Sequence, residues 1–263
     1  MKIIVAIKQV PERDAPIRID AAGKWIEESD LQWALNESDA YALEEALLLK
    51  EKSGDPASEV IVLSAGPERV GVTLREALAK GADRAFHILA DDLASRDALG
   101  LARLLAAAIA PEKPDLILTG LQSEDLGLGQ TGVILAELLG LPHASLILQV
   151  EVLQSGPQAQ IKAKRELEEG WFQEITLPMP ALLTIQSGGN KLRYATLMGI
   201  KRAKTKECRI LPAADLAPSS APVVTLNSVS LPHKQKSTQI LTGSPDEVAA
   251  ALVEKLKTEA RVL

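Results

Sequence analysis

The first half of the chain repeats one pattern, a short apolar run followed by a turn and a segment with helical spacing. The apolar runs lie at residues 2–8, 60–64, 84–89 and 116–119. Runs of this length that alternate with helical segments are typical of βαβ units, whose right-handed crossovers produce a parallel sheet. We therefore predict an α/β fold with a doubly wound parallel sheet at its centre.

Helix start and stop signals lie between these runs. The cluster Asn36-Glu37-Ser38-Asp39 is rich in N-cap residues and predicts a helix that ends near Gly54. A second helix is expected from Pro67 to Gly81, and a third from a Ser95 cap to about residue 109. A fourth is expected over residues 130–139.

The second half changes character. Residues 145–153, 158–165 and 171–177 have strand patterns and are separated by turn signals, which predicts an antiparallel addition to the sheet. Residues 181–185 form one more apolar strand, and Ser187-Gly188-Gly189 is interpreted as a turn. Residues 209–243 are rich in Pro, Ser and Thr and are expected to form an extended arm.

A helix should follow the arm, because Ser244-Pro245-Asp246-Glu247 combines an N-cap serine, an N1 proline and an N3 glutamate. Its apolar stripe must be buried either on the chain's own sheet or on a partner, and the sequence leaves both open. We expect residues 1–222 to form the α/β domain and residues 223–263 to form the arm and helix.

Composition excludes several classes of protein. A net charge of −6 argues against a general nucleic-acid binder. The single cysteine forms no internal disulfide, and no Cys/His spacing suggests a metal site. The N-terminal apolar run is too short to span a membrane or to act as a signal peptide. We expect a cytoplasmic location.

The most chemically suggestive segment is the glycine-rich loop at residues 120–132, between a predicted strand and a helix. In parallel sheets, ligands bind beyond the carboxyl ends of the strands, so the loops that begin at Lys8, Ala65 and Gly120 are the candidate site. Free N–H groups at a helix N-terminus favour a phosphate. Residues 127–132 match G-x-G-x-x-G, but seven residues separate the motif from its strand, which argues against a nicotinamide site.

Several segments together resemble the beta subunit of electron transfer flavoproteins. They include Val5-Ala6-Ile7-Lys8, Leu43-Glu44-Glu45-Ala46, Ser64-Ala65-Gly66-Pro67 and the segment from Gly120 through Thr131. The most specific is Asn190-Lys191-Leu192-Arg193-Tyr194-Ala195-Thr196-Leu197, and order and spacing agree over nearly the whole chain. The resemblance implies an adenine nucleotide alpha hydrolase-like, Rossmann-like α/β fold.

The resemblance also implies cofactors. In that family a heterodimer forms, the alpha subunit carries the redox-active FAD, and the beta subunit holds a structural AMP. Carried over by position, the nucleotide site consists of Ala6, Asn36, Glu37, Ser38, Asp39, Ala65, Gly120, Leu121, Gln122, Ser123, Glu124, Asp125, Leu126, Gly127, Leu128, Gly129, Gln130 and Thr131. Some relatives have Asp and Asn where this chain has Leu126 and Gly129. The hydroxyl of Thr131 resembles the AMP-binding members and favours AMP over a second FAD.

Partner contacts are implied as well. Residues 186–207, the recognition segment, correspond to the loop that docks on a flavin dehydrogenase, with Leu197 as the anchor and Arg193 and Tyr194 beside it. The alternative for Leu197 is packing in the chain's own core. Glu166 resembles a residue that faces the mobile flavin domain of the alpha subunit. The expected electron acceptor is a quinone oxidoreductase.

Three functions remain open from the sequence. The first is an electron carrier subunit without catalytic residues of its own. The second is a bifurcating flavoprotein subunit, in which a second FAD replaces AMP and NADH is the donor. The third is a stand-alone adenine-nucleotide-binding module.

Overall fold

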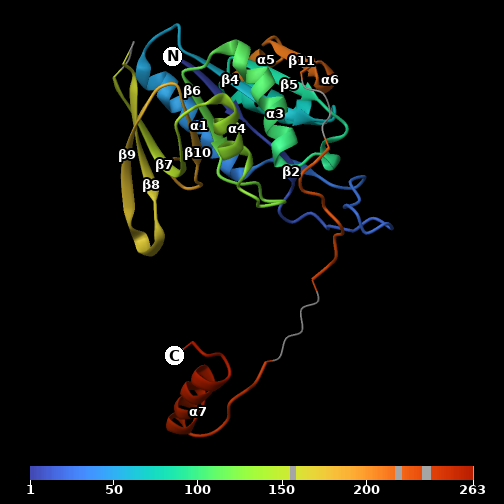
Figure 1. Ribbon diagram of the computed structural model, residues 1–263, viewed down its shortest axis with the longest axis vertical. Coiled ribbons are helices and arrows are strands. Elements are labelled where there is room, and N and C mark those ends of the chain that lie inside the picture. Colours follow the sequence, from blue (N-terminus) through green and yellow to red (C-terminus); the bar gives the residue numbers. More distant parts are fainter. Residues whose placement is uncertain (155–157, 217–220, 233–237, 263) are drawn as a thin grey trace.

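A computed structural model describes residues 1–262 of the chain, apart from residues 155–157, 217–220 and 233–237. Its centre is a nine-stranded sheet, counted over the described residues, with the order β11-β5-β4-β1-β6-β10-β7-β8-β9 (Figure 1). The strands are β1 (Lys2–Ala6), β4 (Glu59–Gly66), β5 (Arg84–Leu89), β6 (Leu116–Gly120), β7 (His143–Gln154), β8 (Gln160–Glu166), β9 (Phe172–Pro178), β10 (Ala181–Ile185) and β11 (Cys208–Pro212). The predicted parallel α/β fold is confirmed.

Helices cover both faces of the parallel part. On one face α1 (Glu37–Ser53) and α2 (Val70–Lys80) pack against a cluster that includes Ile3, Val5 and Leu118. On the other face α3 (Ala98–Ile109) and α4 (Thr131–Leu139) pack against Ile4 and Ile117. Because successive side chains of a strand point to opposite faces, strands buried on both sides are apolar throughout, as the sequence shows.

The antiparallel addition is also confirmed. Strand β7 pairs in parallel with β10 up to Ile147, and from Ile147 onward it pairs antiparallel with β8. Leu146, at the passage from one partner to the other, has a φ of 63°. Strand β9 pairs antiparallel with β8 and completes this addition. The predicted turn at residues 155–157 lies outside the described residues. A separate antiparallel ribbon of β2 (Gln9–Pro11) and β3 (Trp33–Leu35) lies between β1 and α1 along the chain.

Two boundaries differ from the prediction. Ser95 does not cap α3; it ends a short 3-10 turn, and Asp97 caps the helix by accepting a hydrogen bond from the N–H of Gly100 at 2.8 Å. Part of the expected arm is instead folded, because β11 pairs with β5 and is followed by α6 (Ala213–Leu216). The side chains of β11 are mostly exposed, so this edge strand lacks the apolar alternation that reveals strands in a sequence.

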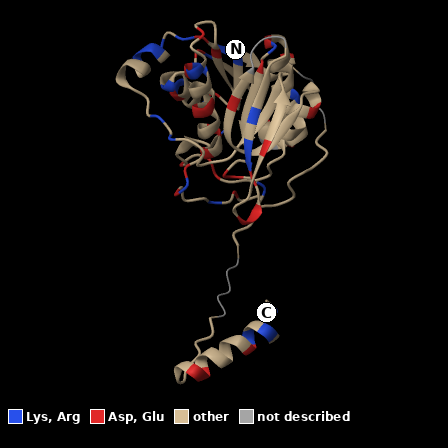
Figure 2. Ribbon diagram, turned by 90° about the vertical axis from the view of Figure 1, so that its left-hand side faces the viewer, with Lys and Arg blue, Asp and Glu red and all other residues tan. Residues whose placement is uncertain are grey.

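The arm leads to α7 (Pro245–Thr258), which lies apart from the body of the molecule in Figure 1. The predicted capping box of Ser244 and Glu247 is present. Acidic residues occupy the first turn of α7 and basic residues the last, as Figure 2 shows, which suits the helix dipole. None of the side chains of α7 is buried. Its apolar stripe is therefore not covered by the described part of the chain.

Candidate functional site

The glycine-rich loop leaves the carboxyl edge of the sheet at Gly120, beside the start of α1. A Cβ atom on Gly120 would lie 2.3 Å from both Oδ1 of Asp39 and Oγ of Ser38. Only glycine permits this approach. The loop and the N-terminus of α1 are therefore packed directly against each other, and the structure brings these two predicted parts of the site together.

Two side chains from the start of α1 hold the loop in shape. Nδ2 of Asn36 donates to the carbonyl of Gln122 at 3.0 Å, and the N–H of Glu124 donates to Oδ1 of Asn36 at 2.9 Å. The hydroxyl of Ser38 donates to the same Gln122 carbonyl at 2.7 Å. Asn36 and Ser38 are both buried. Their polar groups thus fix the loop backbone from within.

Asp39 joins the ends of two neighbouring strands. Its Oδ2 accepts a hydrogen bond from the N–H of Lys8 at 2.7 Å, and its Oδ1 accepts one from the N–H of Gly120 at 2.8 Å. These strands are paired up to Ala6 and Thr119 and separate beyond them. Burial raises the pKa of Asp39 to about 7, although both backbone hydrogen bonds act in the opposite direction. A single carboxyl group therefore satisfies backbone donors where the sheet opens.

Two cations, Lys8 and Arg13, balance the acidic residues of the site. Nζ of Lys8 lies 2.7 Å from Asp125 and lowers the pKa of that carboxyl, against the effect of its burial. Arg13 lies 3.2 Å from Glu37 and 3.1 Å from Glu124. The sequence places Lys8 at the start of one of the candidate loops but does not predict its ion pair. Arg13 lies in a polar loop without any pattern.

The far end of the loop is arranged differently. Gln130 precedes α4, and within the described chain no side chain caps this helix N-terminus. Gln130 is exposed and Thr131 is half-buried, so an amide and a hydroxyl lie beside the free N–H groups of the first turn. Leu126 and Leu128 are exposed, and Gly127 and Gly129 both have a φ of 62°. The donor set of this helix start suits an anion such as a phosphate.

The remaining predicted positions lie on the same edge. Ala6 is buried at the end of β1 and Ala65 is half-buried in β4, the next strand of the sheet. Glu166 ends β8, where its carboxylate accepts a hydrogen bond from Nε2 of Gln186 at 3.4 Å. The carbonyl of Ile185, the residue before Gln186, accepts a hydrogen bond from the N–H of Leu121. Glu166 is thus connected through the end of β10 to the start of the glycine-rich loop.

Two of the predicted partner residues, Tyr194 and Leu197, lie on a second, separate surface. Tyr194 is 92% exposed and Leu197 is 87% exposed, so Leu197 does not pack in the chain's own core. Met198 and Ile200, on the same short helix α5 (Leu197–Ala203), are also exposed. Arg193 is turned the other way, toward α1, where it pairs with Glu44 and Glu51. Ser187-Gly188-Gly189, near the start of the recognition segment, forms the predicted turn.

A cavity of about 1220 Å³ lies away from the glycine-rich loop and reaches the start of the recognition segment at Gly189 and Asn190. Its walls include Met1, Asp115 and Met179, which precede the amino ends of parallel strands, and residues of β7 and β8. Charged side chains in its wall pair with each other, as Lys162 does with Glu174 at 2.8 Å. Ligands of open parallel sheets bind at the opposite, carboxyl edge. The chemistry of the donors, and not the volume, therefore places the candidate site at the glycine-rich loop.

The described residues contain no group of three or more His, Cys, Asp or Glu side chains arranged to hold a metal ion. No helix among them is long and apolar enough to cross a membrane. Cys208 is a free, half-buried thiol whose pKa is raised by burial.

The doubly wound sheet, with a glycine-rich loop at its carboxyl edge, belongs to the class of open α/β folds in which ligands bind beyond the carboxyl ends of the strands. The model of the electron transfer flavoprotein domain matches residues 24–216. The chain is 39% identical over 260 residues to the electron transfer flavoprotein subunit beta of Methylophilus methylotrophus, covering 97% of each chain. It is 36% identical to the mitochondrial beta subunit of Oryza sativa subsp. japonica and to the beta subunit of Bacillus subtilis, covering 100% of each chain. The chain belongs to the electron transfer flavoprotein family, as one of its beta subunits.

Proposed function

We propose that this chain is an electron carrier subunit that binds AMP at its glycine-rich loop and assembles with an alpha subunit that holds FAD. The observation that carries the nucleotide proposal is the uncapped start of α4 beside Gln130 and Thr131. A phosphate there meets backbone N–H groups, an amide and a hydroxyl, which fits a nucleoside monophosphate.

The remaining contacts divide between binding and support. Ala6 and Ala65 lie at neighbouring strands, where their backbone groups would meet the adenine end. Three side chains at the start of α1 support the site indirectly, because their polar atoms already form hydrogen bonds with the loop backbone. They are Asn36, Ser38 and Asp39. The nucleotide is thus proposed to be structural: it fills the carboxyl edge and stiffens the platform beneath the alpha subunit.

The FAD, when bound by the alpha subunit, supplies the redox chemistry. The role of this chain is to orient that subunit and to dock on a flavin dehydrogenase through Leu197. A hydrophobic anchor within a polar rim gives a small, transient interface its specificity. The proposed acceptor is a quinone oxidoreductase, and the proposed location is cytoplasmic, where a free thiol such as Cys208 persists.

The nucleotide site is tested with Thr131→Val, which removes one hydroxyl without changing the volume of the side chain. The heterodimer is purified and the AMP that it retains is measured after denaturation. We expect the affinity for AMP to fall roughly tenfold, because the variant loses about one hydrogen bond to a charged group. The control is Thr176→Val, at an exposed position of β9. Equal AMP content and equal release rates in both variants would remove Thr131 from the site.

A further inference from the structure

The recognition segment presents apolar side chains that the chain itself does not cover. Tyr194, Leu197 and Met198 are exposed, and residues 187–196 form turns and irregular backbone without a helix or strand. An irregular segment with exposed apolar side chains ordinarily samples several conformations. Fixing one of them on binding lowers the affinity. The contacts of this segment with the rest of the fold therefore determine how much ordering docking still requires.

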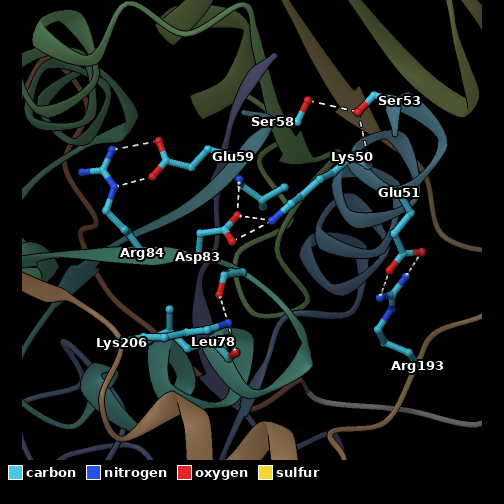
Figure 3. Close-up of polar contacts among 12 residues, drawn as sticks. Lys50, Glu51, Ser53, Ser58, Glu59, Leu78, Asp83, Arg84, Arg193 and Lys206 are labelled. Atoms are coloured by element: carbon cyan, nitrogen blue, oxygen red, sulfur yellow. Dashed lines mark hydrogen bonds and ion pairs between the residues drawn. The ribbon is translucent and has the colours of Figure 1, made fainter. Parts of the chain in front are cut away.

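Arg193 makes the strongest of these contacts. Its Nε lies 3.0 and 2.9 Å from the two carboxylate oxygens of Glu44, and its Nη2 lies 2.9 Å from Oε1 of Glu44. Its Nη1 and Nη2 lie 2.6 and 3.1 Å from the two oxygens of Glu51, as Figure 3 shows for this second pair. The planar guanidinium is thus held by two carboxylates that lie two turns apart on α1.

The two carboxylates that hold Arg193 differ in burial. The side chain of Glu44 is 5% exposed, whereas that of Glu51 is 56% exposed. A buried carboxylate needs its partner, since an unpaired charge in the interior is strongly unfavourable. The backbone N–H of Arg193 also donates to Glu44, at 3.1 Å. Glu44 therefore fixes both the main chain and the side chain at this point.

The segment is fastened on either side of Arg193 as well. Nδ2 of Asn190 donates to Glu45 at 3.1 Å, and Glu45 also accepts a hydrogen bond from the N–H of Val150 in β7. Beyond Leu197, a Cβ atom on Gly199 would lie 2.2 Å from the carbonyl oxygen of Ala79, so α5 rests directly on the end of α2. Between these fixed points the exposed large apolar side chains are those of Tyr194, Leu197 and Met198.

We propose that Arg193, clamped by Glu44 and Glu51, is a positioning residue that presets the recognition segment so that Leu197 is displayed before the dehydrogenase arrives. This inference rests on the proposed docking function of Leu197. The guanidinium of Arg193 makes its contacts within the chain. It affects docking through the recognition segment that it holds in place. The clamp lowers the ordering cost of docking and leaves the electron-transfer step itself unchanged.

The test uses the purified heterodimer and its flavin dehydrogenase. Arg193→Lys keeps the charge but lacks the planar, five-donor guanidinium that holds both carboxylates, and Arg193→Gln with Glu44→Gln removes both charges so that no buried carboxylate is left unpaired. Amide hydrogen exchange is measured over residues 187–200, together with KM and kcat for reduction of the carrier. Arg209→Gln, an exposed arginine on β11, is the control for charge. Nucleotide content confirms that each variant is folded.

We expect faster exchange in the recognition segment and roughly a tenfold rise in KM with kcat changed by less than about twofold in both clamp variants. Unchanged exchange and unchanged KM in both, with Leu197→Ala raising KM, would overturn the clamp while leaving the docking function intact. If Leu197→Ala has no effect on KM, the docking function fails, and with it the role assigned to Arg193. A fall in kcat alone would also contradict positioning, because it would place Arg193 in the transfer step.

Discussion

The carboxylate of Asp39 accepts hydrogen bonds from the backbone N–H groups of Lys8 and Gly120, which belong to the ends of two neighbouring parallel strands. A side chain of α1 thus bridges the two strands at the point where their pairing ends. The same helix start carries Asn36 and Ser38, which hold the glycine-rich loop. The glycine-rich loop of the proposed nucleotide site is therefore held mainly by the start of α1.

The burial of Asp39 predicts a pH dependence of stability. Its pKa is about 7 in the folded chain, against 3.8 for an ordinary Asp, so the folded state binds more protons than the unfolded state between these values. The contribution of Asp39 to the free energy of unfolding therefore falls as the pH rises from about 4 to about 7, and is constant above. The full effect is on the order of 4 kcal/mol at most.

Asp39→Asn removes this titration. Urea unfolding at pH 5 and pH 7.5 should show that the stability of the original chain, relative to the variant, is greater at pH 5. A stability difference that is the same at both pH values would mean that the carboxyl group is ionised throughout, with an ordinary pKa.

The close approach at Gly120 predicts a costly substitution. Gly120→Ala places a methyl group 2.3 Å from Asp39 and Ser38, and should lower the free energy of unfolding by about 1–3 kcal/mol and reduce AMP retention. Gly71, in α2, has no atom within 4 Å of the equivalent position, so Gly71→Ala should stabilise by up to about 1 kcal/mol. Thermal and chemical unfolding of the two variants compares them directly. Similar effects of the two changes would show that the loop yields easily.

The uncovered stripe of α7 predicts a role in assembly. Deletion of residues 224–263 should weaken the heterodimer, because the helix buries none of its side chains on the described part of this chain. Leu252→Asp, which places a charge on the stripe, should weaken it by roughly tenfold or more, whereas Ala250→Asp on the opposite side should not. Sedimentation or size-exclusion of mixed subunits measures this. Undiminished assembly of the truncated chain would indicate that α7 serves no interface.

The place of Glu166 at the carboxyl edge predicts an effect on the flavin. If its carboxylate forms a salt bridge with the mobile flavin domain in one orientation, Glu166→Ala should slow electron transfer severalfold and shift the flavin potential. Glu174→Ala, on the next strand and paired with Lys162, is the matched control. Rates and potential equal to those of the unsubstituted protein would exclude this contact.

The parallel sheet, its helices and the position of the glycine-rich loop could be predicted because local patterns determine them. The predicted cap of α3, Ser95, was wrong: Asp97 caps the helix, and residue type alone does not distinguish two good cap residues. The edge strand Cys208–Pro212 was missed because its side chains are mostly exposed. The bonds of Asn36 to residues 122 and 124, and of Arg193 to Glu44, join positions far apart in the sequence. Such pairings follow from the fold and have no periodicity.

The central claim, a structural AMP beside a single flavin, is tested most directly by the nucleotides of the assembled protein. The chain is purified with its alpha subunit, the complex is denatured, and the released nucleotides are quantified by chromatography. One FAD and one AMP per heterodimer is the predicted result. Two FAD and no AMP would contradict the account, because redox chemistry would then take place in this subunit and the bifurcating function would apply.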